Sequence, residues 1–370
     1  MKTCHDHLAG FCRRAPSPDD LHRTRRGHPI VFLHGNPTSS FLWRGVLPHV
    51  EAPARRLIAP DLIGMGDSDK IPAGAEPDRY RFTSHARYLD AFIDEVAGTE
   101  PLTLVLHDWG GALGFDWACR HQQRVSAIAY METFVAPLTL EDLPESFPPT
   151  LKAVRSSAGE ALVLGENMFI EKVLPGVTQR TLSADEMAEY RRPFLEAGDD
   201  RWPTLQWPRE VPLSGEPADV HDRIAAYSAW LKTASLPKLF IDAEPGIFIT
   251  GRIRRLASSF PNQHRVIVRG LHFVQEDSPD EIGRAIAGWL EGISRTFARL
   301  AKRLRVAHDH VRRQCWPALQ SADYAETCDI VTGLNSKCCG SRVRRICNCE
   351  KPSFPGLGSP SIRGWFWCCL

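Results

Sequence analysis

The sequence predicts an α/β fold in which a mostly parallel central sheet is interrupted once by an inserted helical domain. Six short apolar runs have the length of buried parallel strands, and they span residues 29–33, 56–60, 102–106, 126–131, 238–241 and 264–268. This rhythm stops between 137 and 235, where helical periodicity and frequent proline replace it. Strands that alternate with helices form a parallel sheet covered by helices, and the interruption is expected to form a lid.

The length of 370 residues allows one large α/β domain or two smaller ones. We expect five regions: a flexible lead at 1–28, the first part of the core at 29–136, a helical cap at 137–235, the second part of the core at 236–294, and an extension at 295–370. The extension is basic and rich in cysteine, and most of it is expected to be disordered. Its start has helical spacing, which favours a solvated continuation of the closing helix over a helix on an anionic surface.

Composition argues against several classes of function. The net charge of +1 argues against a nucleic-acid or membrane role, no run of 18 apolar residues occurs, and the first residues lack the apolar core of a secretory signal. Eight of the eleven cysteines follow residue 314, and only Cys119 lies between 29 and 293. This usage is typical of a reducing compartment. We therefore expect a cytoplasmic enzyme body, and we expect a monomer.

The chain is organised around residues 101–111, which read PLTLVLHDWGG. A buried strand leads into Asp108, and Gly110 and Gly111 open the helical pattern that follows. Small residues just past a strand let the helix pack closely while the middle residue of the turn, here Asp108, is held up for attack. A carboxylate in that place can attack saturated carbon and form an ester on the enzyme. The alternative at this point is an Asp that only caps a buried helix.

Other polar residues also follow predicted strands: Asn36, Asp61, Glu132, Asp242 or Glu244, and His272. The carboxyl ends of parallel strands meet along one crevice, so these side chains are expected to converge there. Their order along the chain is nucleophile, acid, histidine, which is the order of the α/β-hydrolase triad.

Five segments together resemble the haloalkane dehalogenases, especially the branch of the hexachlorocyclohexane-pathway enzyme: HGNPTSS at 34–40, DLIGMGDSDK at 61–70, HDWGGALGFDWA at 107–118, YMET at 130–133 and LHFVQEDSPDEIG at 271–283. The resemblance covers about 29–293 and implies an α/β-hydrolase fold with a cap. One departure concerns the start, because the family normally has two antiparallel strands before the HGNP strand and residues 1–28 lack that pattern.

The resemblance implies hydrolytic dehalogenation of a small halogenated aliphatic substrate to a primary alcohol, a halide ion and a proton. Asp108 would displace the halide and form an alkyl ester. Asn36 and Trp109 would bind the expelled anion, which needs neutral donors in an apolar pocket. His272 would activate water, and Glu132 would orient the imidazole. No metal or organic cofactor is expected, and the implied role is xenobiotic detoxification.

Two parts of this site are less certain from sequence. The YMET motif favours Glu132 as the acid, but Asp242 also follows a strand and is a possible second carboxylate near His272. The pocket and its tunnel are expected to be lined by apolar residues of the cap and nearby loops: Phe147, Phe169, Val177, Trp207, Pro208 and Phe248.

Three rival interpretations remain open. An epoxide hydrolase shares the Asp elbow but needs two cap tyrosines as donors, and Tyr190 and Tyr227 occur in that region. A coelenterazine luciferase of the sea pansy type resembles the same branch, and sequence motifs barely separate the two. A catalytically dead hydrolase that serves as a binding module is disfavoured by intact Asp108, His272 and Asn36.

Overall fold

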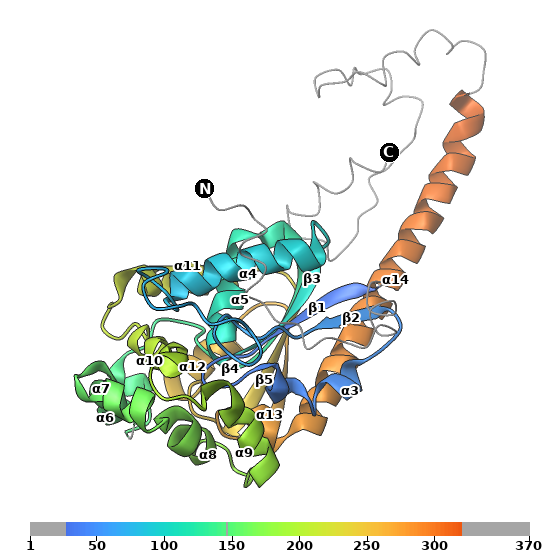
Figure 1. Cartoon of the computed structure of the whole chain (residues 1–370). Helices are drawn as coiled ribbons and strands as arrows, with labels where there is room; N and C mark the ends of the chain where they lie inside the picture. The colour runs from blue at the N-terminus through green and yellow to red at the C-terminus, as the bar shows by residue number, and fades with distance from the viewer. Residues whose placement is uncertain (1–26, 146, 320–370) are drawn as a thin grey trace. The chain divides into compact units, whose positions relative to one another are not determined.

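A computed structural model describes residues 27–145 and 147–319, with only the backbone described at 297, 300, 304 and 307–319. It contains a six-stranded sheet in which every described strand pair is parallel, with the order β2-β1-β3-β4-β5-β6 (Figure 1). The strands are β1 (His28–Leu33), β2 (Arg55–Ile58), β3 (Leu102–His107), β4 (Val125–Thr133), β5 (Lys238–Pro245) and β6 (Gln263–Gly270). All six predicted strands are confirmed.

The two faces of the sheet carry separate hydrophobic cores, because successive strand residues point to opposite faces. Leu104 and Leu106 belong to one core, which also holds residues of α4 (Phe82–Ala97), α5 (Asp108–Arg120), α11 (Ala218–Leu231) and α12 (Gly251–Ser258). Val105 belongs to the other core, with residues of α3 (Leu47–Val50) and the first turns of α14 (Pro279–Leu319). The sheet is therefore the middle of three layers (Figure 1).

The segment between β4 and β5 is helical, as predicted. Its elements before α11 are η3 (Leu140–Asp142), α6 (Phe147–Arg155), α7 (Ala158–Glu160), η4 (Ala161–Gly165), η5 (Phe169–Val173), α8 (Leu174–Gly176), α9 (Ala184–Arg191), η6 (Arg192–Phe194), η7 (Asp199–Arg201) and α10 (Trp202–Arg209). Among its described residues the only β pairing is an isolated bridge between Leu213 and Glu216. α11 lies inside the predicted cap range but packs on the sheet layer, where its Tyr227 contacts Phe115 of α5.

Several boundaries differ from the sequence prediction. β1 begins at His28, inside the predicted lead, and a short 3-10 helix η1 (Ser40–Trp43) precedes α3. β4 and β5 continue past Glu132 and Asp242, so both carboxylates lie within strands. The remainder of the predicted lead, and with it any N-terminal hairpin, falls in 1–26, outside the described residues.

The closing helix α14 continues well past residue 294, the end of the predicted core. α14 extends to Leu319, so the helical continuation expected at the start of the extension is present. The charged side chains Arg295, Arg299, Lys302 and Arg303 on it are exposed. The chain forms two compact units, Met1–Ile293 and Ser294–Leu370, and the cysteine-rich tail at 320–370 lies outside the described residues.

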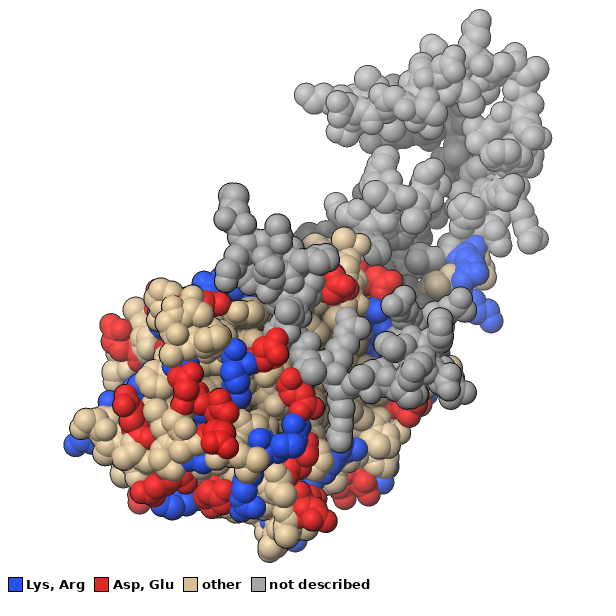
Figure 2. Space-filling view, in the orientation of Figure 1, with Lys and Arg blue, Asp and Glu red and all other residues tan. Residues whose placement is uncertain are grey.

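Two further observations bear on the expected partners. Acidic and basic side chains are interspersed on the face drawn in Figure 2, in keeping with the small net charge. None of the helices in the described part of the chain is long and apolar enough to cross a membrane.

Candidate active site

The turn from β3 into α5 places Asp108 at the carboxyl edge of the sheet. Asp108 has a φ of 47°, in the left-handed region that non-glycine residues rarely adopt, and its side chain is 5 % exposed. A Cβ atom at Gly110 would lie 2.1 Å from the His34 carbonyl oxygen, so only glycine lets α5 approach β1 this closely. The predicted elbow is therefore present, with a carboxylate at its tip.

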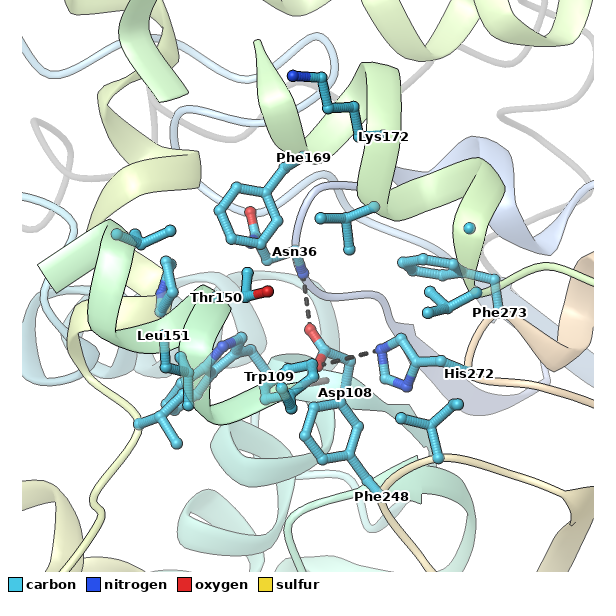
Figure 3. A pocket seen from close by; sticks show the side chains of 18 of the residues that line it. Asn36, Asp108, Trp109, Thr150, Leu151, Phe169, Lys172, Phe248, His272 and Phe273 are labelled. Carbon is cyan, nitrogen blue, oxygen red and sulfur yellow. Dashed lines mark hydrogen bonds and ion pairs between the residues drawn. The ribbon is translucent and has the colours of Figure 1, made fainter. Parts of the chain in front are cut away.

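Asp108 is held from two sides (Figure 3). The backbone N–H of Asn36 donates to Asp108 Oδ1 at 2.7 Å, and His272 Nε2 lies 3.4 Å from Oδ2. The turn that carries Asn36 is braced by His34, whose Nδ1 lies 3.0 Å from the Gly35 carbonyl oxygen and whose Nε2 accepts from the Leu62 N–H. A Cβ at Gly35 would lie 2.0 Å from Asp108 Oδ1, so glycine is required where the carboxylate approaches.

His272 lies between two carboxylates. Its Nδ1 is 3.6 Å from Glu132 Oε2, on the side opposite Asp108. Glu132 does not line the cavity, and its fully buried carboxylate accepts three backbone N–H bonds, from Ile247 and Phe248 at 2.9 Å and from Ile249 at 3.3 Å. These N–H groups fix the Glu132 carboxylate beside the imidazole of His272.

The pKa values of His272 and Asp108 depend on each other because the two side chains are buried next to each other. Burial by itself would lower the pKa of His272, but hydrogen bonds and charge interactions with Asp108 and Glu132 raise it to about 9. Burial opposes ionisation of Asp108, yet the contacts with His272 hold its pKa below the usual value. The Asp108 carboxylate and the charged form of His272 therefore stabilise each other.

Two other predicted strand-end carboxylates do not join the site. Asp242, within β5, forms ion pairs with Arg254 at 3.0 Å and with Arg265, so it is not a second carboxylate at His272. Asp61 accepts the backbone N–H groups of Ser40 and Asp67 at 2.6 and 2.8 Å. Both side chains stabilise neighbouring structure instead.

A cavity of about 200 Å³ opens onto Asp108 and His272, and Asn36 and Trp109 line it as well (Figure 3). Five of the six predicted pocket residues line it: Phe147, Phe169, Val177, Pro208 and Phe248. Trp207 is the exception, and this corrects the prediction. Its ring is fully buried between Trp109 and His85, stacked on them at centroid distances of 4.8 and 4.1 Å. Successive residues of a helix point about 100° apart, so Pro208 reaches the cavity and Trp207 does not.

Other lining residues were missed: Phe134, Thr150, Leu151, Val154, Lys172, Val173, Gly176, Val211, Ile247 and Phe273. Phe134 and Phe273 lie beside predicted site residues in the sequence, so proximity along the chain is the signal that could have found them. The lining residues of α6 and η5 carry no comparable signal, because their contact with the cavity depends on how the helices pack.

The two tyrosines that an epoxide hydrolase would need are engaged elsewhere. Tyr190 donates its hydroxyl to Glu276, and Tyr227 donates to the Phe134 carbonyl oxygen. Neither lines the cavity. Across the described residues, no cluster of three or more His, Cys, Asp or Glu side chains could hold a metal ion.

The fold and this site define the class of the protein. Residues 28–279 match the model of the alpha/beta hydrolase fold family, to which the chain belongs. The haloalkane dehalogenase of Sphingobium indicum is 54 % identical over 265 residues, which cover 71 % of this chain and 88 % of the relative. Within that fold class, the chain is a member of the haloalkane dehalogenase family.

A solved structure and a second relative complete the comparison. The crystal structure of haloalkane dehalogenase DbeA from Bradyrhizobium elkani is similar with a TM-score of 0.69 and 40 % identity, covering 77 % of this chain and 94 % of that one. The coelenterazine h 2-monooxygenase of Renilla reniformis is 41 % identical over 266 residues, or 71 % of this chain and 84 % of the relative. The likeness to a luciferase branch expected from the sequence is thus present, at lower identity.

Proposed function

We propose that this chain hydrolyses small haloalkanes to a primary alcohol, a halide ion and a proton through an alkyl ester on Asp108. One observation carries the proposal: the Asp108 carboxylate lies at the base of a largely apolar cavity with a histidine 3.4 Å away. Such a cavity suits a halogenated aliphatic substrate, and the helices between β4 and β5 would act as its cap.

In the first step an Asp108 oxygen attacks the carbon that bears the halogen. A carbon–oxygen bond forms, the carbon–halogen bond breaks, and the electron pair leaves with the halide. An anion released in an apolar site needs fixed donors. The side-chain amide of Asn36 and the indole N–H of Trp109, both at the cavity, are the proposed donors.

The second step uses the change of charge that the first step produces. Once Asp108 is a neutral ester, the carboxylate that raised the pKa of His272 is gone, and the imidazole can lose its proton. Neutral His272 then takes a proton from water, and the hydroxide attacks the ester carbonyl carbon. The Asn36 N–H already bonded to Asp108 Oδ1 would stabilise the oxyanion, with the Trp109 N–H as its partner.

The remaining roles follow from the contacts of His272. Glu132 is the proposed acid, since it faces Nδ1 and stabilises the imidazolium that forms during hydrolysis. Collapse of the intermediate breaks the bond between the Asp108 carbonyl carbon and the alkoxide, which takes the proton from His272. The alcohol leaves and Asp108 is regenerated.

We also propose that the enzyme acts as a cytoplasmic monomer without a metal or organic cofactor. The support for a reducing compartment is the cysteine usage of the enzyme body, where Cys119 is a free thiol among the described residues. Size-exclusion chromatography with light scattering tests the monomer: a mass near 41 kDa is expected, and a dimer mass would refute it.

Halide release tests the reaction itself. Purified protein is incubated with 1-iodobutane or 1,2-dibromoethane, and released halide is measured beside an Asp108→Ala variant. Release that disappears in Asp108→Ala is expected. Absence of release from a protein shown to be folded by circular dichroism would refute the proposal.

The same preparation separates the rival activities. Incubation with an epoxide should yield no diol, because neither Tyr190 nor Tyr227 lines the cavity. Incubation with coelenterazine and oxygen addresses the monooxygenase relative. Light emission without halide release would favour that activity over dehalogenation.

A further inference from the structure

The loop that carries His272 is tied by its backbone to the helical segment above the sheet. The N–H groups of His272 and Phe273 both donate to the carbonyl oxygen of Val177, just after α8, at 3.1 and 3.3 Å. On the other side, His107 Nε2 donates to the His272 carbonyl oxygen at 2.8 Å. The peptide of the proposed base is therefore held between the cap and the strand that precedes Asp108.

Side chains extend this tie beyond Val177. Asp277, in the short helix α13 (Val274–Asp277), accepts the backbone N–H groups of Gln179 and Arg180 at 2.8 and 3.1 Å. Arg180 Nε donates to the Glu276 carbonyl oxygen at 2.7 Å, and its guanidinium also pairs with the Glu276 carboxylate. Residues 177–180 thus contact residues 272–277 through both main chain and side chains.

The Glu276 carboxylate is 2 % exposed, so it depends on its cations. Arg44 binds it with two bonds at 2.6 and 2.7 Å, and Arg180 binds it from the cap. Both arginines also bind Glu186 of α9, which closes a ring of two positive and two negative groups. Arg44 and the Tyr190 hydroxyl also bind this carboxylate, and Arg180 is the cation that ties it, and with it α13, to the cap.

We propose that Arg180 is a positioning residue for dehalogenation, which keeps His272 in place by holding residues 272–277 to the cap. The inference rests on the proposed role of His272 as the base. A displacement of about 1 Å in a catalytic group can cost about 100-fold in rate. The attack by Asp108 uses no base, so loss of Arg180 should slow ester hydrolysis and spare halide release.

Arg192 provides a matched control. It also joins the cap to the core, through Asp67, and it pairs with Glu189 at 3.0 Å, but it does not touch residues 272–277. Its side chain is 43 % exposed, close to the 35 % of Arg180. Arg180→Met and Arg192→Met therefore both remove a surface-accessible bridge between cap and core, and only one of them borders His272.

Rapid-mixing kinetics with 1-iodobutane separate the two steps. In Arg180→Met, we expect a halide burst within about twofold of wild type and ester hydrolysis at least about tenfold slower. Both steps should stay within about twofold of wild type in Arg192→Met. Arg180→Lys keeps the positive charge but not the planar fork, so it should be intermediate. It also serves as the test if Arg180→Met does not fold.

Hydrogen exchange measures how firmly the backbone at His272 and Phe273 is held, and it needs no substrate. In the full-length protein, the His272 and Phe273 amides should exchange at least about tenfold faster in Arg180→Met and at the wild-type rate in Arg192→Met. Unchanged hydrolysis, equal slowing of both steps, or unchanged exchange in Arg180→Met would overturn the proposal. If wild type releases no halide, the proposed function fails, and the exchange result still decides whether Arg180 fixes the His272 loop.

Discussion

Replacing Glu132 with glutamine tests the role of its charge. The carboxylate accepts N–H bonds from Ile247 and Phe248 at 2.9 Å and faces His272 Nδ1 at 3.6 Å. Glutamine has nearly the same shape, but it carries no charge and presents an NH₂ group where only acceptors are wanted. The substitution therefore removes the stabilisation of the imidazolium with little change in volume.

The size of the effect follows from the distance. Two unit charges 3.6 Å apart interact by about 4–5 kcal/mol at an effective dielectric constant near 20. Each 1.36 kcal/mol corresponds to about tenfold in rate. Ester hydrolysis in Glu132→Gln should therefore be slower by roughly a thousandfold, while attack by Asp108 changes little because it needs no base.

Rapid mixing with halide detection measures both steps. We expect a burst of about one halide per enzyme followed by almost no turnover. Glu244→Gln is the control, because Glu244 is an exposed carboxylate at the end of β5. Turnover of folded Glu132→Gln within tenfold of wild type would refute the assigned role.

Three further predictions concern the same site. His272→Ala should accumulate the alkyl ester, seen by mass spectrometry as one added alkyl group that Asp108→Ala lacks. The pKa of folded His272, about 9, exceeds its ordinary value of 6.5. The raised pKa contributes on the order of 3 kcal/mol to the free energy of unfolding; this contribution is full below pH 6.5 and is lost as pH rises through 9. Urea unfolding at several pH values should show this dependence in wild type and not in His272→Gln. Asp242→Asn should lower the free energy of unfolding by about 2 kcal/mol, a moderate loss because the two arginines that pair with Asp242 are partly exposed. The substitution should leave kcat unchanged. A large loss of kcat would mean that Asp242 takes part in catalysis.

The sequence predicted the strands and nine of the 19 residues that line the cavity, because these features are local. Asp108 and Trp109 come just after the buried strand β3, His272 comes just after β6, and parallel strands bring such ends together. The glycines after Asp108 also indicate a close approach of the helix, since a Cβ atom at Gly110 would lie only 2.1 Å from the His34 carbonyl oxygen. Short-range patterns of this kind need no knowledge of tertiary packing.

The choice between Glu132 and Asp242 could not be made from strand ends alone. Both lie near the end of a strand, and what separates them is their partners. Asp242 meets Arg254 and Arg265, whereas Glu132 meets backbone N–H groups more than a hundred residues away. These partners are defined only once the strands pair and the loop after β5 folds.

Long-range packing also explains the other errors. Trp207 was expected in the pocket as an apolar residue of the cap, but in α10 its ring stacks on Trp109 and does not reach the cavity. The bond between Arg44 and Glu276 joins residues 232 positions apart. No periodicity or motif in the sequence indicates such a pair.

The covalent role of Asp108 is tested most directly by a single turnover in ¹⁸O-labelled water. With enzyme in excess over 1-iodobutane, the alcohol should carry unlabelled oxygen from Asp108, and mass spectrometry should find ¹⁸O in the Asp108 carboxylate. Label in the alcohol and none in Asp108 would mean that water displaces the halide directly, and would contradict the ester mechanism.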